Sequence, residues 1–342
     1  MSAEQLGFIV ISVESAHTNA DFYLNNSRHQ SITFPTLLGR PIQSGVQIGF
    51  ENRHDLIGQQ VEDRSHQLTV KSPLQYGLIT NFDDFEKIIH HALFSQLKVT
   101  PDEHPCLLLV SNTEKNQQKI VQSLFETFNV PLVSLLDRSV ASVVGCNQVS
   151  ALLIDIGYQS MRACCIHEQS VVEKTYQSSK IGGNDVSLSL AKLFPSQTTA
   201  SFLESVKKKH CFVQLDLKKQ TNHTIKINGE EIVDSQLSQP TQLLFDPTLI
   251  DSNERSIIEL ALDAIHACPK PLQKKMVSSI LIVGGSSLLK GLDEKFEKCL
   301  KSLLPSNLAD LVKVVNKEMK HDTFMNGAMK IASESLKKFL NG

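Results

Sequence analysis

The stretch Ala151–Ile166, with the sequence ALLIDIGYQSMRACCI, constrains the fold of this chain more than any other. An apolar strand leads into an aspartate, Asp155, and a glycine, Gly157, before a turn and a second apolar strand follow. Proteins can hold phosphate and a hydrated metal ion in this way, through the carboxylate and the backbone N–H groups of the turn. Tyr158 and Gln159 stand where small residues would let phosphate approach. The stretch is therefore either a working phosphate loop or what remains of one.

Strands and helices alternate along the remainder of the chain, a pattern typical of an α/β fold. The 342 residues are enough for two domains or one large two-lobed body. An apolar strand followed by a polar turn and a second strand occurs near Gly7 as well as at Ala151, which suits two similar halves that face a cleft. Buried strands are predicted at Gly7–Ser12 and Cys106–Asn112, and helices at Asp83–Leu97, Glu114–Phe128, Ser139–Val144 and Glu254–Cys268.

Composition indicates a globular chain and argues against several classes of function. The hydrophobic share of 41% and the charged share of 20% are ordinary, so disorder is not expected. The net charge of −2, without a basic block, disfavours nucleic-acid binding. No apolar run approaches the roughly 18 residues of a membrane span. Seven scattered cysteines and no signal peptide indicate a reduced intracellular protein. Cys164 and Cys165, adjacent on a strand, should pack on opposite faces.

Neither a metal site nor a catalytic constellation is predicted from the residue pattern. No Cys/His spacing indicates zinc. His90 and His91 diverge by about 100° around a predicted helix, so one should face inward and the other outward. The basic run Lys207–His210 is interpreted as a solvated helix face, with a contact for a partner or an anionic ligand as the alternative. The chain also has no nucleophile elbow, Walker loop or dinucleotide fingerprint.

Five stretches resemble actin, in actin's order and at nearly its spacing, from about Phe8 to Ser333. They are FPTLLGRP (Phe34–Pro41), YGLITNFDDFEKIIHHALFSQLKVTPDEHPCLL (Tyr76–Leu108), FETFNVP (Phe125–Pro131), CFVQLD (Cys211–Asp216) and ILIVGGSSLLKGL (Ile280–Leu292). The chain is identified as a divergent actin-related protein, within the superfold that also contains heat-shock chaperones and sugar kinases. A sugar kinase would need a sugar-facing catalytic aspartate, and we find none.

The resemblance implies an α/β, actin-like, two-lobed fold with a central cleft for ATP and a divalent cation. Each lobe would be a mixed sheet with flanking helices and a smaller outer subdomain. By register, the first lobe is residues 1–145, with its outer subdomain at about 36–71. The second is 146–321, with its outer subdomain at about 182–256. Residues 322–342 return to the first lobe as a tail that we expect to be shorter than actin's.

The first phosphate loop, Ser12–Asn19, is degenerate by the same comparison. Actins carry an aspartate, two glycines and a phosphate-touching lysine there. The aspartate orients metal-bound water, and the two glycines let the backbone approach phosphate closely. The corresponding residues here are Ser12, Glu14, Ala16 and Asn19. Glu14 would also bring a carboxylate near phosphate, which is a like-charge contact. Only Ser15 matches a phosphate-contacting serine.

The second loop keeps Asp155 and Gly157 but has lost the acid and the glycine that follow in actins. Arg138 stands where actins place the glutamine that positions the attacking water, and Arg162 stands for a histidine of the proton-handling network. Arginine cannot accept a proton at neutral pH, so we expect no hydrolysis. Two interpretations of Arg138 stay open. It pairs with Asp155 and takes over the cation's electrostatic role, or it points to solvent or to a partner.

Part of actin's nucleotide-contacting set is retained. The matching residues are Ser15, Asp155, Gly157, Gly182, Gly183, Asp185, Lys207, Gly284, Gly285 and Ser286. Asn184 replaces an arginine, and Lys208 replaces an acid that contacts the ribose. The pair Gly284–Gly285 at a strand-to-helix turn is also explained by packing alone. The resemblance therefore implies ATP or ADP binding at weakened affinity, with no resident cofactor and no bound metal expected.

The predicted function is that of a non-catalytic actin-related structural subunit of a multiprotein cytoskeletal assembly in the cytoplasm. Its partners would be actin, other actin-related proteins or complex subunits, with no direct nucleic-acid or membrane contact. The outer subdomain around Phe34–Gln59, at the pointed end in the family, and the curtailed barbed end favour this interpretation. The alternatives are a subunit of a nuclear chromatin-remodelling complex and an ATP-binding, filament-forming actin-like ATPase.

Overall fold

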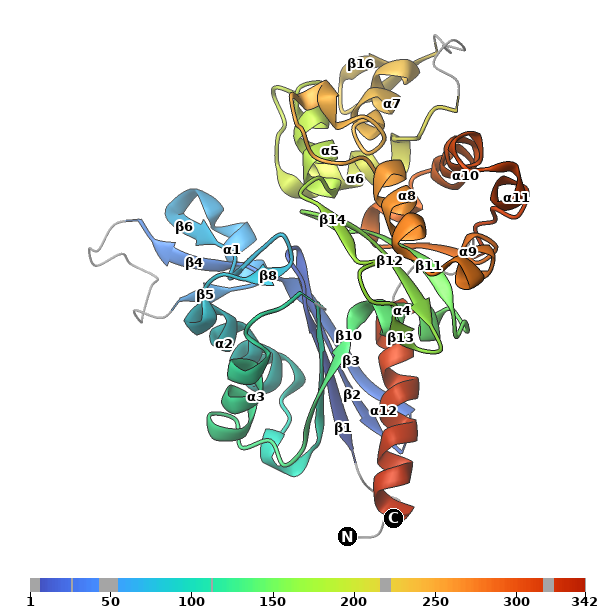
Figure 1. Cartoon of the computed structure of the whole chain (residues 1–342). Coiled ribbons are helices and arrows are strands. Elements are labelled where there is room, and N and C mark those ends of the chain that lie inside the picture. The colour runs from blue at the N-terminus through green and yellow to red at the C-terminus, as the bar shows by residue number, and fades with distance from the viewer. Residues whose placement is uncertain are drawn as a thin grey trace. The chain divides into compact units, whose positions relative to one another are not determined.

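The computed structural model describes residues 7–25, 27–42, 55–111, 113–215, 223–315 and 323–341, with side chains in the last range as far as residue 335. The chain divides into two compact units, one of residues 1–141 with 324–342 and the other of residues 142–323. The boundaries expected after residues 145 and 321 lie close to these. Part of the outer subdomain expected at about 36–71, residues 43–54, lies outside the described ranges. Both units contain sheets flanked by helices, which confirms the predicted α/β class (Figure 1).

A five-stranded sheet in the order β10-β9-β1-β2-β3 is the centre of the first unit. Strand β1 pairs with β2 as an antiparallel hairpin and with β9 in parallel, and β9 pairs with β10 in parallel. The strands are β1 (Phe8–Val13), β2 (His17–Leu24), β3 (Ser27–Pro35), β9 (Cys106–Val110) and β10 (Val133–Asp137). The helices are α1 (Gln59–Asp63), α2 (Phe82–His90), α3 (Gln117–Glu126), α4 (Arg138–Gly145) and α12 (Thr323–Asn341), with 3₁₀ turns at Ser65–Gln67 and Pro101–Glu103.

Strand β1 is apolar at almost every position because both faces of its sheet are covered. Ile9 and Ile11 face the core that includes residues of α2 and α3. Phe8 and Val10 point to the opposite face, where they pack with Met325 and other residues of α12. Successive side chains of a strand alternate between faces, so one continuous apolar run supplies two cores.

Helix α2 begins at Asn81, whose side chain accepts a hydrogen bond from the backbone N–H of Asp84 at 3.1 Å. The predicted acidic first turn is present, and it suits the positive end of the helix dipole. The helix then continues as a π-helical segment, His91–Leu97, so the predicted extent is right but the hydrogen-bond pattern changes. His91 packs edge-on against Phe34, whereas His90 is exposed, which confirms that they diverge.

Arg40 ties the outer part of the first unit to α2. That part holds a small sheet of β4 (Leu38–Pro41), β5 (Leu56–Ile57) and β6 (Leu68–Lys71), and beside it lies the hairpin of β7 (Leu74–Gln75) and β8 (Leu78–Ile79). Arg40 Nε lies 3.0 Å from Asp55 Oδ1, and Arg40 Nη2 lies 2.5 Å from Asp84 Oδ1. Lys87 also pairs with Asp55. Since Asp84 is only 2% exposed, its charge depends on these cations.

The second unit contains a sheet in the order β13-β12-β11-β17, with β14 paired to β12, and a separate hairpin of β15 and β16. Its strands are β11 (Ala151–Ile156), β12 (Met161–His167), β13 (Ser170–Val171), β14 (Gln177–Ser179), β15 (Thr224–Ile227), β16 (Glu230–Val233) and β17 (Ile280–Val283). Its helices are α5 (Gly183–Ala191), α6 (Ala200–His210), α7 (Asp234–Gln242), α8 (Ile257–Ala267), α9 (Lys270–Val277), α10 (Leu292–Leu303) and α11 (Ser306–Ala309), with 3₁₀ turns at Pro247–Ile250 and Gly285–Leu288.

The two central sheets share one connectivity. Strand β11 forms an antiparallel hairpin with β12 and pairs in parallel with β17, as β1 does with β2 and β9. The resemblance between the sequences near Gly7 and Ala151 therefore reflects a repeated structural unit. In both units the turn that follows the first strand is the one that the sequence marks as a candidate phosphate loop.

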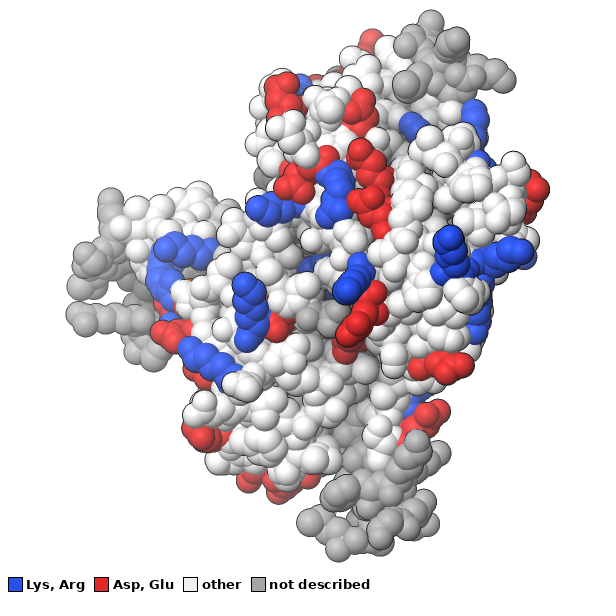
Figure 2. Space-filling model, in the orientation of Figure 1, with Lys and Arg blue, Asp and Glu red and all other residues white. Residues whose placement is uncertain are grey.

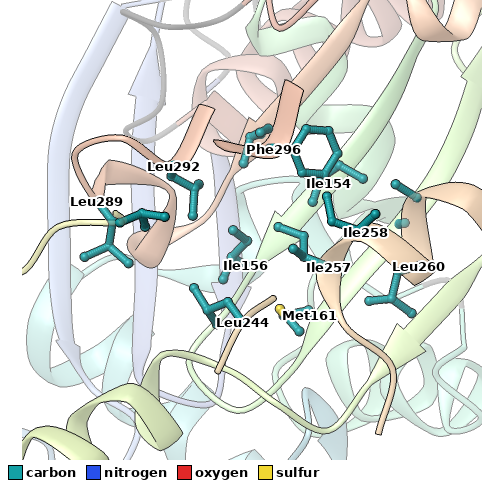
Figure 3. Close-up of a cluster of buried hydrophobic side chains, with 14 of the residues drawn as sticks. Ile154, Ile156, Met161, Leu244, Ile257, Ile258, Leu260, Leu289, Leu292 and Phe296 are labelled. Atoms are coloured by element: carbon teal, nitrogen blue, oxygen red, sulfur yellow. The ribbon is translucent and has the colours of Figure 1, made fainter. Parts of the chain in front are cut away.

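Buried residues of β11 and β12 supply the main core of the second unit. Ile154, Ile156 and Met161 pack with residues of α8 and α10, among them Ile257 and Phe296 (Figure 3). Cys165 lies in this core, whereas Cys164 lies in the cluster on the opposite face of the sheet, which confirms that the two cysteines alternate. Among the helices of the described ranges, none combines the length and the apolar character that crossing a membrane requires.

Candidate functional site

The first candidate loop is the turn between β1 and β2, and an arginine pairs with its carboxylate. The backbone N–H of Glu14 donates to His17 O at 3.1 Å and closes the turn. Arg138 Nη1 lies 2.9 Å from Glu14 Oε2, and both side chains are partly buried. Strands β1, β9 and β10 run parallel, so their carboxyl ends meet at one sheet edge. Arg138 follows β10, and this is why it reaches Glu14.

The side chains at two phosphate-contacting positions of this loop, Ser15 and Asn19, make hydrogen bonds within the first unit. Ser15 Oγ accepts a hydrogen bond from the backbone N–H of Gly77 at 3.0 Å, in the turn of the β7–β8 hairpin. Asn19 Oδ1 accepts a hydrogen bond from Thr33 Oγ1 on β3 at 2.9 Å. Ser15 is also 9% exposed. These contacts hold the hairpin and the sheet together.

Asp137 is a residue of this edge that the sequence analysis missed. Its Oδ1 accepts a hydrogen bond from Ser139 N at 2.6 Å, which caps the start of α4. Its Oδ2 is buried and meets no hydrogen-bond partner among the described residues. An acid at the end of an apolar strand, directly before Arg138, was the signal that could have identified it.

In the second candidate loop, an arginine lies across the hairpin from the aspartate. Asp155 and Arg162 are register partners on β11 and β12, and Arg162 Nη1 lies 4.0 Å from Asp155 Oδ2. Arg162 is 9% exposed, so its charge is largely shielded from water. The pairing of Arg138 with Asp155 would join residues of different units, and it stays a prediction.

The N-terminal backbone N–H groups of α5, which could bind an anion, already have acceptors. Gly183 N donates to Gly157 O at 2.9 Å, and Asn184 N donates to Tyr158 O at 2.7 Å. Gly182 N donates to the carboxylate of Asp185 at 2.8 Å. The turn after β11 therefore caps the helix with its own carbonyl oxygens. Burial raises the pKa of Asp185, although the N–H of Gly182 acts in the opposite direction.

Close packing accounts for three of the four glycines of the matching pairs. A Cβ on Gly182 would lie 2.5 Å from Tyr158 O, and one on Gly183 would lie 2.4 Å from Ser286 Oγ. Gly284 has a φ of +93°, and a Cβ there would lie 2.4 Å from Ile156 O. Gly285 alone faces open space. The packing interpretation therefore explains Gly284 but not Gly285.

Lys207 is buried, which corrects the interpretation of Lys207–His210 as a wholly solvated face. It is 6% exposed, whereas the three residues that follow it are exposed. Its Nζ donates to Gly183 O at 3.1 Å and to Ser187 Oγ at 3.0 Å. It also pairs with Glu204 one turn earlier on α6. The charge of Lys207 is thus compensated inside the second unit.

The structure brings most of the predicted set together in the second unit. The neighbouring members are Asp155, Gly157, Gly182, Gly183, Lys207, Gly284 and Ser286. Asp185 lies behind them as a helix cap, and Ser15 belongs to the first unit. Within the described residues, no group of three or more His, Cys, Asp or Glu side chains could hold a metal ion.

Two α/β units define the structural class of this chain: each central sheet has a hairpin with a parallel third strand, and each carries an acid at or just after the end of its first strand. A model of the actin family matches residues 4–236 and 199–339. The chain therefore belongs to the actin family, and the resemblance found in the sequence is confirmed.

Proposed function

We propose that this chain is a non-catalytic, actin-related structural subunit of a multiprotein cytoskeletal assembly. Its nucleotide site would be degenerate, and its fold would contribute shape and contact surface to the assembly. The observation that carries the proposal is the Glu14–Arg138 ion pair, with 2.9 Å between its atoms, at the first loop. The guanidinium of Arg138 compensates the carboxylate that this loop would otherwise present to phosphate.

The same relation in the second unit supports the proposal. Asp155 faces Arg162 across the hairpin at 4.0 Å. Arginine stays charged at all physiological pH values, so neither carboxylate needs a metal ion for its compensation. Neither arginine can serve as a general base. Arg138 stands in place of the glutamine that positions the attacking water in actins, so a cation replaces that group.

Several donors beside the second loop are also committed to the protein. The N–H groups of Gly183 and Asn184 donate to the turn, and Lys207 is held by three acceptors. A nucleotide would have to break these bonds and leave buried groups unpaired, which costs roughly 1–3 kcal/mol for each group. The residues present therefore do not fit a magnesium–triphosphate, and we derive no reaction step through one.

Turnover and stabilisation by Mg-ATP test this proposal together. The full-length chain should release no phosphate from Mg-ATP above the background without protein, and millimolar Mg-ATP or Mg-ADP should leave its melting temperature unchanged. Conventional actin, assayed in parallel, serves as the positive control. A ligand at a hundred times its Kd would stabilise the fold by roughly 2.7 kcal/mol. A clear shift or measurable turnover would overturn the degenerate-site proposal.

The cytoskeletal assignment needs a separate test, because the degenerate site fits a chromatin-remodelling subunit equally well. The outer part of the first unit, held to α2 by Arg40, supports a contact role at that end. Gentle purification of the tagged protein from cells should recover stoichiometric actin-family subunits in the cytoplasmic fraction. Recovery with the motor subunit of a nuclear remodelling complex would favour the alternative instead.

One observation favours the second alternative, a filament-forming ATPase. Gly285 faces open space, and no packing requirement explains it. A retained nucleotide site would account for that glycine, and it would predict tightly bound nucleotide and salt-dependent polymerisation. Sedimentation at low and high salt, with and without Mg-ATP, separates this alternative from the proposal.

A further inference from the structure

Helix α9 and the segment after α11 form a basic surface in the second unit. This surface, the α9 surface, consists of Lys270, Lys274, Lys275 and Lys313 with the flanking residues Leu311 and Val315. The three lysines of α9 are exposed, as is Lys313. In Figure 2, Lys and Arg side chains gather at the edge of the molecule where Figure 1 places α9.

Backbone hydrogen bonds fix the position of Lys313 beside α9. Lys313 N donates to Val277 O, at the end of the helix, at 3.0 Å, and Ile280 N donates to Lys313 O at 3.0 Å. Residues 312 and 314 are buried, so the alternation of an extended segment turns Lys313 and Val315 outward. Leu311 and Val315 are 39% and 37% exposed. The surface therefore combines positive charge with apolar side chains.

The four lysines have no compensating carboxylate in the part of the chain that the structure describes. Within the described ranges, the side-chain nitrogens of these lysines make neither a hydrogen bond nor an ion pair. Lys270 and Lys274 are one turn apart on the same helix face, an arrangement of like charges that lowers helix stability by some tenths of a kcal/mol. Lys270 also lies at the N-terminal end of α9, where the helix dipole disfavours a cation. Folding alone does not explain this arrangement.

The charge is local and is not a property of the whole chain. Residues 269–315 contain eight lysines, no arginine and four carboxylates, although the chain as a whole has a net charge of −2. Glu297, one of those acids, is engaged with Lys301 at 3.9 Å and with Val314 N at 2.8 Å. Salt screens the attraction between this patch and a charged ligand beyond one Debye length, about 8 Å at physiological salt.

We propose that the α9 surface binds an acidic segment of a partner protein, in which Asp or Glu residues alternate with apolar ones. The lysines would pair with the carboxylates, and Leu311 and Val315 would contact the apolar side chains. This inference rests on the proposed function, because an assembly subunit needs partner contacts. The contact itself requires no nucleotide and can be measured on the isolated protein. Its failure would leave the degenerate-site proposal untouched.

A protein segment fits this surface better than a nucleic acid does. Phosphate recognition favours the planar, bidentate guanidinium group, and residues 269–315 contain no arginine. A polyanion also senses charge over a long range, where the net charge of −2 would oppose its approach. The exposed leucine and valine have no counterpart on a phosphate backbone.

The test measures binding of a fluorescein-labelled twelve-residue peptide of Glu and Leu to the full-length chain by fluorescence anisotropy. The probe is compared with the same peptide carrying Gln in place of Glu, at about 50 and 150 mM NaCl, since exposed ion pairs weaken with salt. We expect saturable binding of the acidic peptide alone. A duplex DNA of matched charge is titrated in parallel.

Charge reversal locates the site. The variant Lys274→Glu/Lys275→Glu/Lys313→Glu should bind the acidic peptide at least tenfold more weakly. Its matched control, Lys174→Glu/Lys192→Glu/Lys226→Glu, changes the same charge at exposed lysines elsewhere in the second unit and should stay within twofold of the native chain. Thermal melting checks that the triple Lys→Glu variant folds. If it does not fold, the variant with Gln at the same three positions of the α9 surface is used instead. Three results would overturn the proposal: no binding of the acidic peptide, an equal loss of binding in both triple variants, or binding of the duplex DNA through the same lysines as tightly as the peptide.

Discussion

Arg138 and Glu14 form an ion pair at one edge of the first unit's sheet, with 2.9 Å between Nη1 and Oε2. The acid lies in the turn after β1, and the arginine opens α4 after β10. In the second unit, Arg162 on β12 lies across the hairpin from Asp155 on β11, with 4.0 Å between Nη1 and Oδ2. Each of these two acids of the actin-family chain thus has an arginine from its own unit beside it.

A double-mutant cycle should show that the first pair contributes to folding. Glu14→Gln and Arg138→Gln should each lower the free energy of unfolding by roughly 1–2 kcal/mol, because each leaves a partly buried charge without its partner. The double variant should lose less than the sum, with a coupling of about 1 kcal/mol. Urea denaturation of the native chain, the two single variants and the double variant measures this coupling energy. Strict additivity would show that the two side chains do not depend on each other.

The adjacent glycines Gly284 and Gly285 should respond in opposite ways to alanine. Gly284→Ala forces a Cβ onto Ile156 O at a φ of +93°, and it should destabilise the fold by roughly 2–4 kcal/mol. Gly285→Ala meets open space, so its effect should stay within about 0.5 kcal/mol. Thermal or urea unfolding of the two variants decides. Equal losses at both positions would mean that the backbone of this turn differs from the one described.

Replacing either of the two neighbouring aspartates in the first turn of α2 by asparagine should lower the free energy of unfolding by very different amounts. Asp84 is 2% exposed and paired with Arg40, so Asp84→Asn should lower the free energy of unfolding by about 2 kcal/mol or more. Asp83 is exposed, and Asp83→Asn should cost no more than about 0.5 kcal/mol through the helix dipole. The two variants keep side-chain shape and remove one charge each. A larger loss for Asp83 would contradict the network described here.

Asp55 should make stability depend on pH in the acidic range. Burial raises the pKa of Asp55, but hydrogen bonds from Lys87 and Arg40 outweigh that effect and hold the pKa below its ordinary value. A carboxyl with a depressed folded pKa contributes stability that is complete above its unfolded pKa, about 3.9, and is lost as the pH falls through the folded value. The stability difference between the native chain and Asp55→Asn should therefore be constant above about pH 5 and shrink below pH 4. A difference that grows on acidification would reverse this sign.

Local periodicity was enough to predict much of the fold. The apolar runs at β1, β9 and β11 indicated strands, and the period of two placed Cys164 and Cys165 on opposite faces, where the structure has them. The echo between the segments near Gly7 and Ala151 anticipated the repeated hairpin. The widening of α2 into a π-helix was not predicted, because the spacing of apolar residues hardly differs between the two helix types.

The candidate site depended on contacts between distant segments, and these were harder to predict. The burial of Lys207 requires acceptors on α5 as well as Glu204, whereas three lysines in a row suggest a solvated face. The partner of Arg138 within its own unit is Glu14, whereas the sequence led us to weigh only Asp155, solvent or another protein. Sequence matching predicted which residues form the candidate site but not which of them bind one another.

The nucleotide content of the purified protein shows whether the candidate site is degenerate or still holds ATP or ADP. The chain would be purified gently in buffer with magnesium, denatured, and the released ATP and ADP quantified against protein, with actin prepared alongside. The account predicts released nucleotide far below one molecule for each chain, because the groups that would hold phosphate are bound to one another. Near-stoichiometric ATP or ADP would contradict it and would show that the turn at Asp155 still works as a phosphate loop.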